Sequence, residues 1–365
     1  MRRYIAEKSR IIENIETVRR MAEDAVVYGV LKLNGYGLGL EDMARLLGEN
    51  GIDHFCVTQT ADVTRLAETG VAAREILLLR PLYDAEEIER VAAIPAAVFT
   101  VGSPEEAALL DAAARRLGTA LRAHVKIDTG LGRYGVPWDD VKTAARLYTD
   151  TPRLAITGTY THFAAPGREK TLASHAERFR SALDGLAAAG VDTGRRHCAN
   201  SMTFTHHPAL RMDAVRIGSA LLGRVPGGEA AGLRRVGVCE AEIITVRTLP
   251  AGETVGYGAV YRAKRPMRVA VADVGAVHGL HGGSLRGRRS LRTGLGALYH
   301  DAASLLRGGA GFSGELNGQP VPVVGEVFSE CAVLDVAGIE CRPGDVVRFD
   351  INPLYAHDME RVWLP

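Results

Sequence analysis

Apolar runs and amphipathic segments alternate along the first two thirds of the chain. Short runs rich in β-branched and aromatic residues predict strands that begin near Ala25, His54, Glu75, Ala96, Leu121, Leu154, Arg195 and Met212. Amphipathic segments such as 40–50, 103–118 and 176–190 lie between them, and several end at a glycine, as helices commonly do. Eight such units within about 230 residues favour a closed parallel (β/α)8 barrel of the TIM type over a doubly wound open sheet.

The pattern changes near residue 233. Six further runs alternate with glycine and proline turns and contain almost no helical periodicity, which predicts an all-β domain. We therefore expect a barrel over residues 1–232 and a C-terminal β-domain over residues 233–365. The segment near 282–311 fits neither pattern and is expected to be an inserted loop.

Composition narrows the functional class only modestly. The chain has 365 residues, of which 47% are apolar and 24% charged, with a formal net charge of +1. This balance gives no electrostatic reason to expect a nucleic acid or a membrane as partner. The five cysteines lack CxxC spacing, which favours reduced thiols in a cytoplasmic protein over disulfides or a metal site. No signal peptide and no membrane-spanning run are visible.

Reactive side chains fall at or just past the ends of the predicted barrel strands, where barrels place their chemistry, with Lys126 inside the fifth strand. They are Lys32, Lys126, Arg133, His162, His197, Asn200, Ser201 and Arg216. Each alone has an ordinary structural explanation, but their convergence on one barrel mouth favours an active site. A lysine of lowered pKa can form a Schiff base, and the small residues Ser201, Gly218 and Ser219 stand where barrels often bind phosphate. Together with an arginine near a heterocyclic nitrogen, these features suggest pyridoxal 5′-phosphate.

The motifs that carry these residues resemble those of the alanine racemase family, which are fold-type III pyridoxal phosphate enzymes. The stretches "VLKLNGYGLG", "HVKIDTGLGRYG", "THFA", "HCANS" and "DAVRIGSALLG" follow in the family's order and spacing. The first departs from the pattern at Leu38, where the family usually has histidine. The β-domain stretches "TVGYGAVYRA" and "VVGEVFSECAVLDV" match more loosely.

The resemblance implies a role for each residue. Lys32 carries the cofactor as a Schiff base and is the catalytic base on one face of the substrate α-carbon. Arg216 faces the pyridine nitrogen and is oriented by His197 and Asn200. The other implied assignments are His162 against the ring, phosphate contacts from Tyr36, Ser201, Gly218, Ser219 and Tyr355, and Arg133 in contact with cofactor and substrate. Lys126 matches a lysine that is often carbamylated, although an interior ion pair with Asp128 is the alternative.

The chain also departs from the family on the wall that supplies the second base. Ala276 stands at the position of the usual tyrosine, and a substrate-contacting Cys-Met-Asp motif reads Phe328-Ser329-Glu330. His278 is the nearest candidate for a replacement base, followed by His281, or Tyr299 and His300 of the insertion. The small side chains of Ala276 and Ser329 suggest a substrate larger than alanine.

The resulting expectation is a homodimeric racemase or epimerase with shared active sites, acting on an amino acid other than alanine or on a broader range. Two alternatives remain open. A one-base enzyme would use the same cofactor for retro-aldol cleavage, elimination or decarboxylation. A non-catalytic racemase homologue would bind the cofactor without turnover.

Overall fold

The computed structural model describes residues 1–259, 261–280 and 309–365, which form two compact units. One unit comprises Ser9–Val236. The other comprises Met1–Lys8 together with Gly237–Pro365. None of the helices in the described ranges is long and apolar enough to traverse a bilayer.

The first unit is a closed parallel barrel, as the sequence predicts. Its strands are β2 (Val26–Val30), β3 (His54–Val57), β4 (Glu75–Leu78), β5 (Ala97–Val101), β6 (Leu121–Asp128), β8 (Leu154–Tyr160), β9 (Arg195–Asn200) and β10 (Ala214–Ile217). They pair in the order β5-β4-β3-β2-β10-β9-β8-β6, and β5 also pairs with β6, which closes the ring. The two-residue strand β7 (Val136–Pro137) is added to β6.

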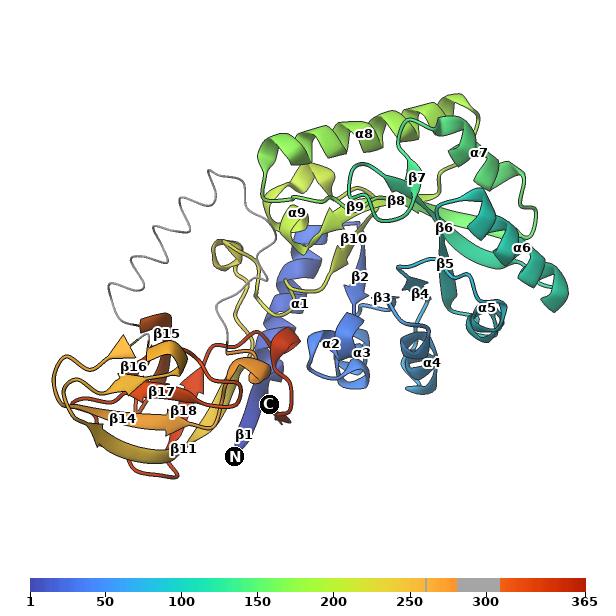
Figure 1. Cartoon of the computed structure of the whole chain (residues 1–365). Helices are drawn as coiled ribbons and strands as arrows, with labels where there is room; N and C mark the ends of the chain where they lie inside the picture. The colour runs from blue at the N-terminus through green and yellow to red at the C-terminus, as the bar shows by residue number, and fades with distance from the viewer. Residues whose placement is uncertain (260, 281–308) are drawn as a thin grey trace. The chain divides into compact units, whose positions relative to one another are not determined.

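Most of the helices lie around these strands in Figure 1. They are α1 (Lys8–Ala22), α2 (Lys32–Tyr36), α3 (Leu40–Glu49), α4 (Thr60–Glu68), α5 (Ala85–Ala92), α6 (Pro104–Leu117), α7 (Val141–Thr149), α8 (Glu169–Ala188) and α9 (Ser201–His206). Helix α6 illustrates how the sequence sets their ends. The Ser103 hydroxyl accepts from the Glu106 N–H at 3.2 Å, Pro104 fixes the first turn, and Gly118 ends the helix at φ +65°.

The barrel interior is built from side chains that alternate along the strands. Tyr28 and Val30 on β2 pack with Cys56, Leu77 and Val98 from the neighbouring strands, and all of them are buried. Because side chains on a strand point alternately inward and outward, polar residues at the same spacing also face the interior. This alternation places the site described below.

The second unit is an all-β structure. Its strands are β1 (Arg2–Glu7), β11 (Val238–Leu249), β12 (Thr254–Val255), β13 (Tyr261–Arg262), β14 (Met267–Ala272), β15 (Gly309–Leu316), β16 (Gln319–Val324), β17 (Ala332–Asp335), β18 (Val346–Phe349) and β19 (Glu360–Leu364). The main sheet runs β14-β17-β16-β15-β18-β11-β1-β19, and β14 also pairs with β11. Strand β1 thus pairs with β11 on one side and with β19 on the other.

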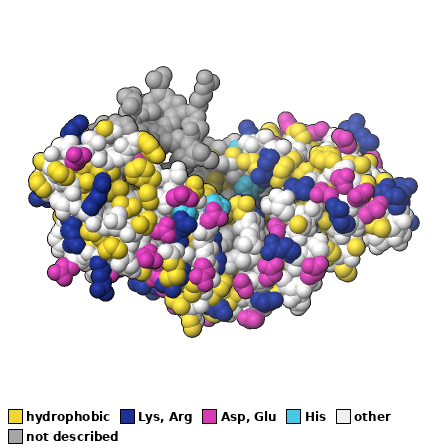
Figure 2. Space-filling view, turned by 60° about the horizontal axis from the view of Figure 1, so that its bottom comes forward, with side chains coloured by type: hydrophobic (Ala, Val, Ile, Leu, Met, Phe, Trp, Pro, Cys, Tyr) yellow, Lys and Arg dark blue, Asp and Glu magenta, His cyan; other side chains and the backbone are white. Residues whose placement is uncertain are grey.

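The face of the molecule drawn in Figure 2 shows no segregation of charge by sign. On the face drawn in Figure 2, basic and acidic side chains are interspersed, in keeping with the near-zero net charge of the sequence.

Candidate active site

A cavity of about 290 Å³ opens at the carboxyl ends of the barrel strands. Its lining residues are Val30, Lys32, Tyr36, Thr58, Leu79, Arg133, Tyr134, Tyr160, His162, Asn200, Ser201, Met202, Arg216, Gly218 and Ser219. The structure therefore brings most of the barrel residues named from the sequence into one cavity. His197 and Lys126 are buried beside its lining residues.

The short element α2 begins at Lys32, just after β2, and is not an ordinary right-handed helix. Leu33, Asn34, Gly35 and Tyr36 all have φ between +53° and +64°, so the turn is left-handed. The Gly35 N–H donates to the Leu31 carbonyl at 3.0 Å. Left-handed backbone costs roughly 1–2 kcal/mol at each non-glycine residue. The chain thus holds Lys32 at a strained segment, as is common at functional sites.

The environment of Lys32 favours the neutral amine. Burial in the cavity wall, reinforced by the nearby positive charge of Arg133, lowers the pKa of the Lys32 ammonium. The Nζ atom lies 5.6 Å from the centre of the Tyr36 ring. A neutral lysine amine is the form that can attack an aldehyde or accept a proton.

A small-residue pocket lies next to Lys32. The Ser201 hydroxyl accepts from the Gly218 N–H at 3.1 Å and from the Ala220 N–H at 3.2 Å, which ties the start of α9 to the loop after β10. A Cβ at position 218 would come within 2.3 Å of the Tyr36 hydroxyl, so only glycine fits beneath this ring. Hydroxyls and backbone amides gathered around such a space suit a phosphate group.

Arg216 forms the floor of the cavity and is 3% exposed. One terminal nitrogen donates to His197 Nδ1 at 2.5 Å, and the other donates to the Thr161 carbonyl at 2.7 Å. Its guanidinium carbon lies 5.1 Å from the Tyr160 ring centre. Asn200, expected to help orient Arg216, accepts the Thr203 N–H and caps α9.

The loop after β6 carries Arg133 to the cavity. The Asp128 carboxylate accepts from the N–H groups of Gly130, Leu131 and Gly132, which fixes the loop. Lys126 donates from Nζ to the Tyr134 carbonyl and lies 4.8 Å from the Tyr134 ring centre. Burial lowers the pKa of Lys126 to about 8, although Asp128 opposes this shift.

His162 is held neutral at the same mouth. Burial, and then the charges of Arg216 and Arg133, lower the pKa of its imidazole to about 3. A neutral ring adds no further positive charge beside Lys32.

The remaining predicted site residues belong to the β-unit. Ala276 and Val277 donate their N–H groups to the carbonyls of Phe328 and Ser329, at 2.9 and 3.0 Å. The two departures from the family pattern are therefore neighbours. His278 is 1% exposed, and its Nδ1 accepts the Gly275 N–H at 3.0 Å.

Tyr355 is 47% exposed. The alternative base candidates His281, Tyr299 and His300, and most of the expected 282–311 insertion, lie outside the described residues.

Several residues of the site carried no recognised signal in the sequence analysis. Thr58, Leu79, Tyr134, Tyr160 and Met202 line the cavity. Tyr160 could have been found by counting inward positions along β8, and Tyr134 lies directly after Arg133 in the loop.

An eight-stranded parallel barrel with a lysine after its first strand and an arginine on its last, followed by an all-β unit, defines the fold-type III class of pyridoxal phosphate enzymes. The comparisons specify the family. The alanine racemase N-terminal domain model matches residues 7–226, and the alanine racemase C-terminal domain model matches residues 236–352. The chain belongs to the alanine racemase family, whose cofactor is pyridoxal 5′-phosphate.

Individual relatives agree over most of the chain. An alanine racemase of Synechocystis is 29% identical over 93% of this chain and 87% of its own length. One from Corynebacterium efficiens is 32% identical over 74% of this chain and 73% of its own. The solved alanine racemase of D-cycloserine-producing Streptomyces lavendulae has a TM-score of 0.82 at 23% identity and covers 100% of this chain and 97% of that one. That of Pseudomonas aeruginosa has the same TM-score at 22% identity, covering 100% and 99%.

Proposed function

We propose that the protein is a pyridoxal phosphate-dependent amino-acid racemase whose substrate range extends beyond alanine. The observation that carries the chemistry is Lys32, an amine of lowered pKa at the mouth of a cavity whose floor is a fully anchored arginine. Family membership supports the reaction class. The extended substrate range rests on Ala276 and Ser329 alone.

The residues around the cavity fit the cofactor. Gly218 leaves room under Tyr36 where any side chain would collide, and Ser201 holds the adjoining loop. We assign Ser201, Gly218, Ser219 and Tyr36 to the phosphate, with Tyr355 as a contribution from the β-unit. We further assign Lys32 to the cofactor's aldehyde and His162 to one face of the cofactor's pyridine ring. Arg133 is assigned to the phenolic oxygen of the cofactor and to the substrate.

When bound, the cofactor supplies an electron sink that makes the α-hydrogen of an amino acid removable. The chain's own residues then decide how the proton moves. Lys32 would take the α-proton on one face, because burial and the charge of Arg133 lower the pKa of its ammonium. Arg216 donates hydrogen bonds but keeps its protons, so a cofactor ring nitrogen held beside it would stay unprotonated and the ring would withdraw less electron density.

The opposite face needs a second proton donor. The family tyrosine is absent at Ala276, and we propose His278 for this role. Because its Nδ1 accepts from Gly275, only Nε2 of His278 could exchange a proton. Burial lowers the pKa of this imidazole, with the Arg2 charge acting in the same direction, which favours its neutral form.

The substrate range is tested with a panel of L- and D-amino acids incubated with holoenzyme in heavy water. We expect α-hydrogen exchange and inversion from both enantiomers, with at least one substrate larger than alanine turned over at least as well as alanine. Alanine as the best substrate would remove the proposed range. A His278→Ala variant should lose exchange from one enantiomer preferentially.

A one-base enzyme is the second candidate, favoured by the missing tyrosine. It predicts label entering from one enantiomer without inversion, together with a cleavage or decarboxylation product. The same incubation, analysed by mass spectrometry, separates the two functions. A cofactor-binding protein without turnover would show no exchange from either enantiomer.

We also propose a homodimer in the cytoplasm with active sites shared between subunits. The family is typically dimeric. If the β-unit residues assigned to the site come from the partner subunit, each active site is built from two chains. Mixing a Lys32→Ala chain with a His278→Ala chain would then restore part of the activity.

A further inference from the structure

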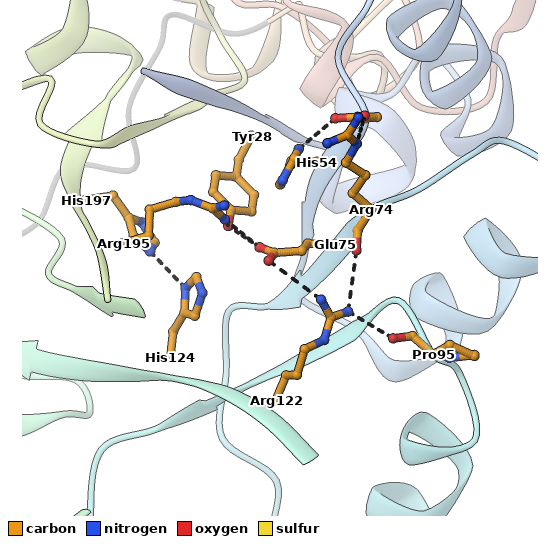
Figure 3. A network of polar contacts seen from close by, with 10 residues as sticks. Tyr28, His54, Arg74, Glu75, Pro95, Arg122, His124, Arg195 and His197 are labelled. Carbon is orange, nitrogen blue, oxygen red and sulfur yellow. Dashed lines mark hydrogen bonds and ion pairs between the residues drawn. The ribbon is translucent and has the colours of Figure 1, made fainter. Parts of the chain in front are cut away.

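Two groups of buried or partly buried polar side chains lie in the barrel interior below Arg216. His197 contacts Arg216. His124 Nδ1 lies 2.9 Å from His197 Nε2, and Figure 3 draws this histidine pair. Below them, toward the amino ends of the strands, the Glu75 carboxylate accepts hydrogen bonds from Tyr28 and Arg195. His124 and His197 are both 0% exposed.

The hydrogen bonds fix which ring nitrogens carry protons. Arg216 can only donate, so His197 Nδ1 must accept. A neutral His197 then carries its proton on Nε2 and donates it to His124 Nδ1. His124 in turn carries its proton on Nε2, and this buried atom has no hydrogen-bond partner among the residues that the structure describes.

The surroundings keep both imidazoles neutral. Burial is the main cause that lowers the pKa of His124, to about 3. Burial, followed by the charge of Arg216, lowers the pKa of His197 well below its usual value. The Glu75 carboxylate, which would favour a charged imidazole, accepts instead from Tyr28 and from Arg195 at 2.9 Å, with Arg122 at 3.7 Å.

Packing also fixes the plane of the His197 ring. The Tyr160 ring lies 5.0 Å away at an interplanar angle of 8°, and the Tyr28 ring lies 5.6 Å away at 20°. His124 lies over Gly158, where a Cβ would come within 2.8 Å of Nε2. These contacts restrain the orientation of both rings. An unpaired buried N–H is unfavourable, and its presence at His124 Nε2 indicates that the pair serves something other than stability.

We propose that His124 is a positioning residue for Arg216. By accepting the His197 Nε2–H, it keeps His197 Nδ1 unprotonated, and that nitrogen fixes the guanidinium at the cavity floor. The pair transmits orientation and moves no proton. This inference rests on the proposed function insofar as Arg216 serves the cofactor ring.

Two substitutions separate the acceptor atom from the bulk of the ring. In His124→Asn an amide oxygen can replace Nδ1 as acceptor, whereas His124→Leu leaves the His197 N–H unpaired. For the Leu variant, we expect the product of kcat and the affinity for pyridoxal 5′-phosphate to fall roughly 5- to 150-fold, with a smaller change in substrate KM. The Asn variant should stay within about threefold of the parent.

His54→Leu is the matched control. His54 is a buried imidazole at the start of β3, 5.2 Å edge-on from Tyr28, and its ring nitrogen bonds Asp53 rather than the His197 pair. We expect this change to leave cofactor affinity and kcat unaltered. Equal losses in the Asn and Leu variants, or a loss in the control as large as in the Leu variant, would overturn the proposal.

Nitrogen-15 NMR of histidine-labelled parent protein tests the tautomers directly. Both His124 and His197 should show a protonated Nε2 and an unprotonated Nδ1, and His197 should keep this pattern in the Asn variant. A proton on His197 Nδ1 overturns the proposal even if the Leu variant fails to fold. Since the tautomers and cofactor affinity are measured without turnover, a failure of the proposed racemase activity remains distinguishable.

Discussion

Substituting alanine for Gly218 is the sharpest test of the cofactor pocket. The new Cβ would lie 2.3, 2.4 and 2.5 Å from three atoms of the Tyr36 side chain. All three distances are shorter than real Cβ contacts, so the ring must move by about 1 Å to reach ordinary contact. The φ of Gly218 is not in the left-handed region, so the effect comes from space and not from backbone strain.

The expected cost is that of overpacking, about 1–3 kcal/mol of the free energy of unfolding of the barrel unit. Because the obstacle is a single side chain, removing it should remove the cost. In a Tyr36→Ala background, Gly218→Ala should therefore cost much less, giving a coupling energy of about 1–3 kcal/mol between the two positions. The displaced ring should also weaken binding of pyridoxal 5′-phosphate.

Urea unfolding of the cofactor-free protein measures the cost without reference to catalysis. Of the two tryptophans, Trp138 belongs to the barrel unit and Trp363 to the β-unit. A Trp363→Phe background makes the fluorescence of Trp138 specific for the barrel. A parallel titration with pyridoxal 5′-phosphate reports the pocket.

Gly167→Ala provides the control. Gly167 is exposed, and a Cβ there would meet only Met202 at 3.5 Å, an ordinary contact. Its expected effect is within about 0.5 kcal/mol. The reasoning is refuted if Gly218→Ala lowers the free energy of unfolding no more than this control does. It is also refuted if Gly218→Ala costs as much in the Tyr36→Ala background as in the parent.

Three further outcomes follow from the electrostatics. Arg133→Met should raise the pKa of Lys32, since it removes one of the two causes that lower it. In reductive alkylation of the cofactor-free protein, the pH at which Lys32 reaches half its maximal reactivity should move upward. An unchanged midpoint would count against this. With a pKa of about 8, Lys126 is roughly one-tenth neutral at pH 7, so carbon-13 bicarbonate should give a carbamate signal that Lys126→Ala abolishes. His124→Asn should flatten the loss of stability below pH 6.5. The pKa of His124 in the folded protein is about 3, so this residue takes up a proton in the unfolded chain first as the pH drops. The free energy of unfolding of the parent then falls by about 1 kcal/mol per pH unit. An equal loss of stability between pH 7 and pH 5 in parent and variant would refute this.

The barrel could be predicted from sequence because its signals are local. Most of the eight strands are short apolar runs followed by an amphipathic segment, and the strand starts agree with the structure to within a few residues. The cavity residues at strand ends follow from the same regularity, as Lys32 and Arg216 illustrate. What tied them to a cofactor was the set of family motifs, not periodicity.

The polar interior of the barrel was less visible. In "LRAHVKI" the alternation places Arg122, His124 and Lys126 on one face of β6, but a strand buried on both sides gives no sign of which face is the interior. Arg122 pairs with Glu75, 47 residues away in sequence, and His124 pairs with His197, 73 residues away; only closure of the ring brings these strands together. Contacts of this kind depend on register across the whole barrel.

The placement of β1 was also beyond local pattern. Arg2–Glu7 reads as the opening of the barrel segment, yet it pairs antiparallel with β11 and parallel with β19. Nothing in six residues specifies partners that lie more than two hundred positions away.

This pairing has a consequence for the order in which the protein can acquire its structure during synthesis. Residues 9–236 can emerge from the ribosome and close their ring while β1 still lacks both neighbours. At about 5–20 residues per second, the first strand waits many seconds for β11 and longer for β19. During that interval its unpaired edge is a site for premature association, and its arginines, Arg2 and Arg3, are the kind of charged residues that discourage edge-to-edge pairing.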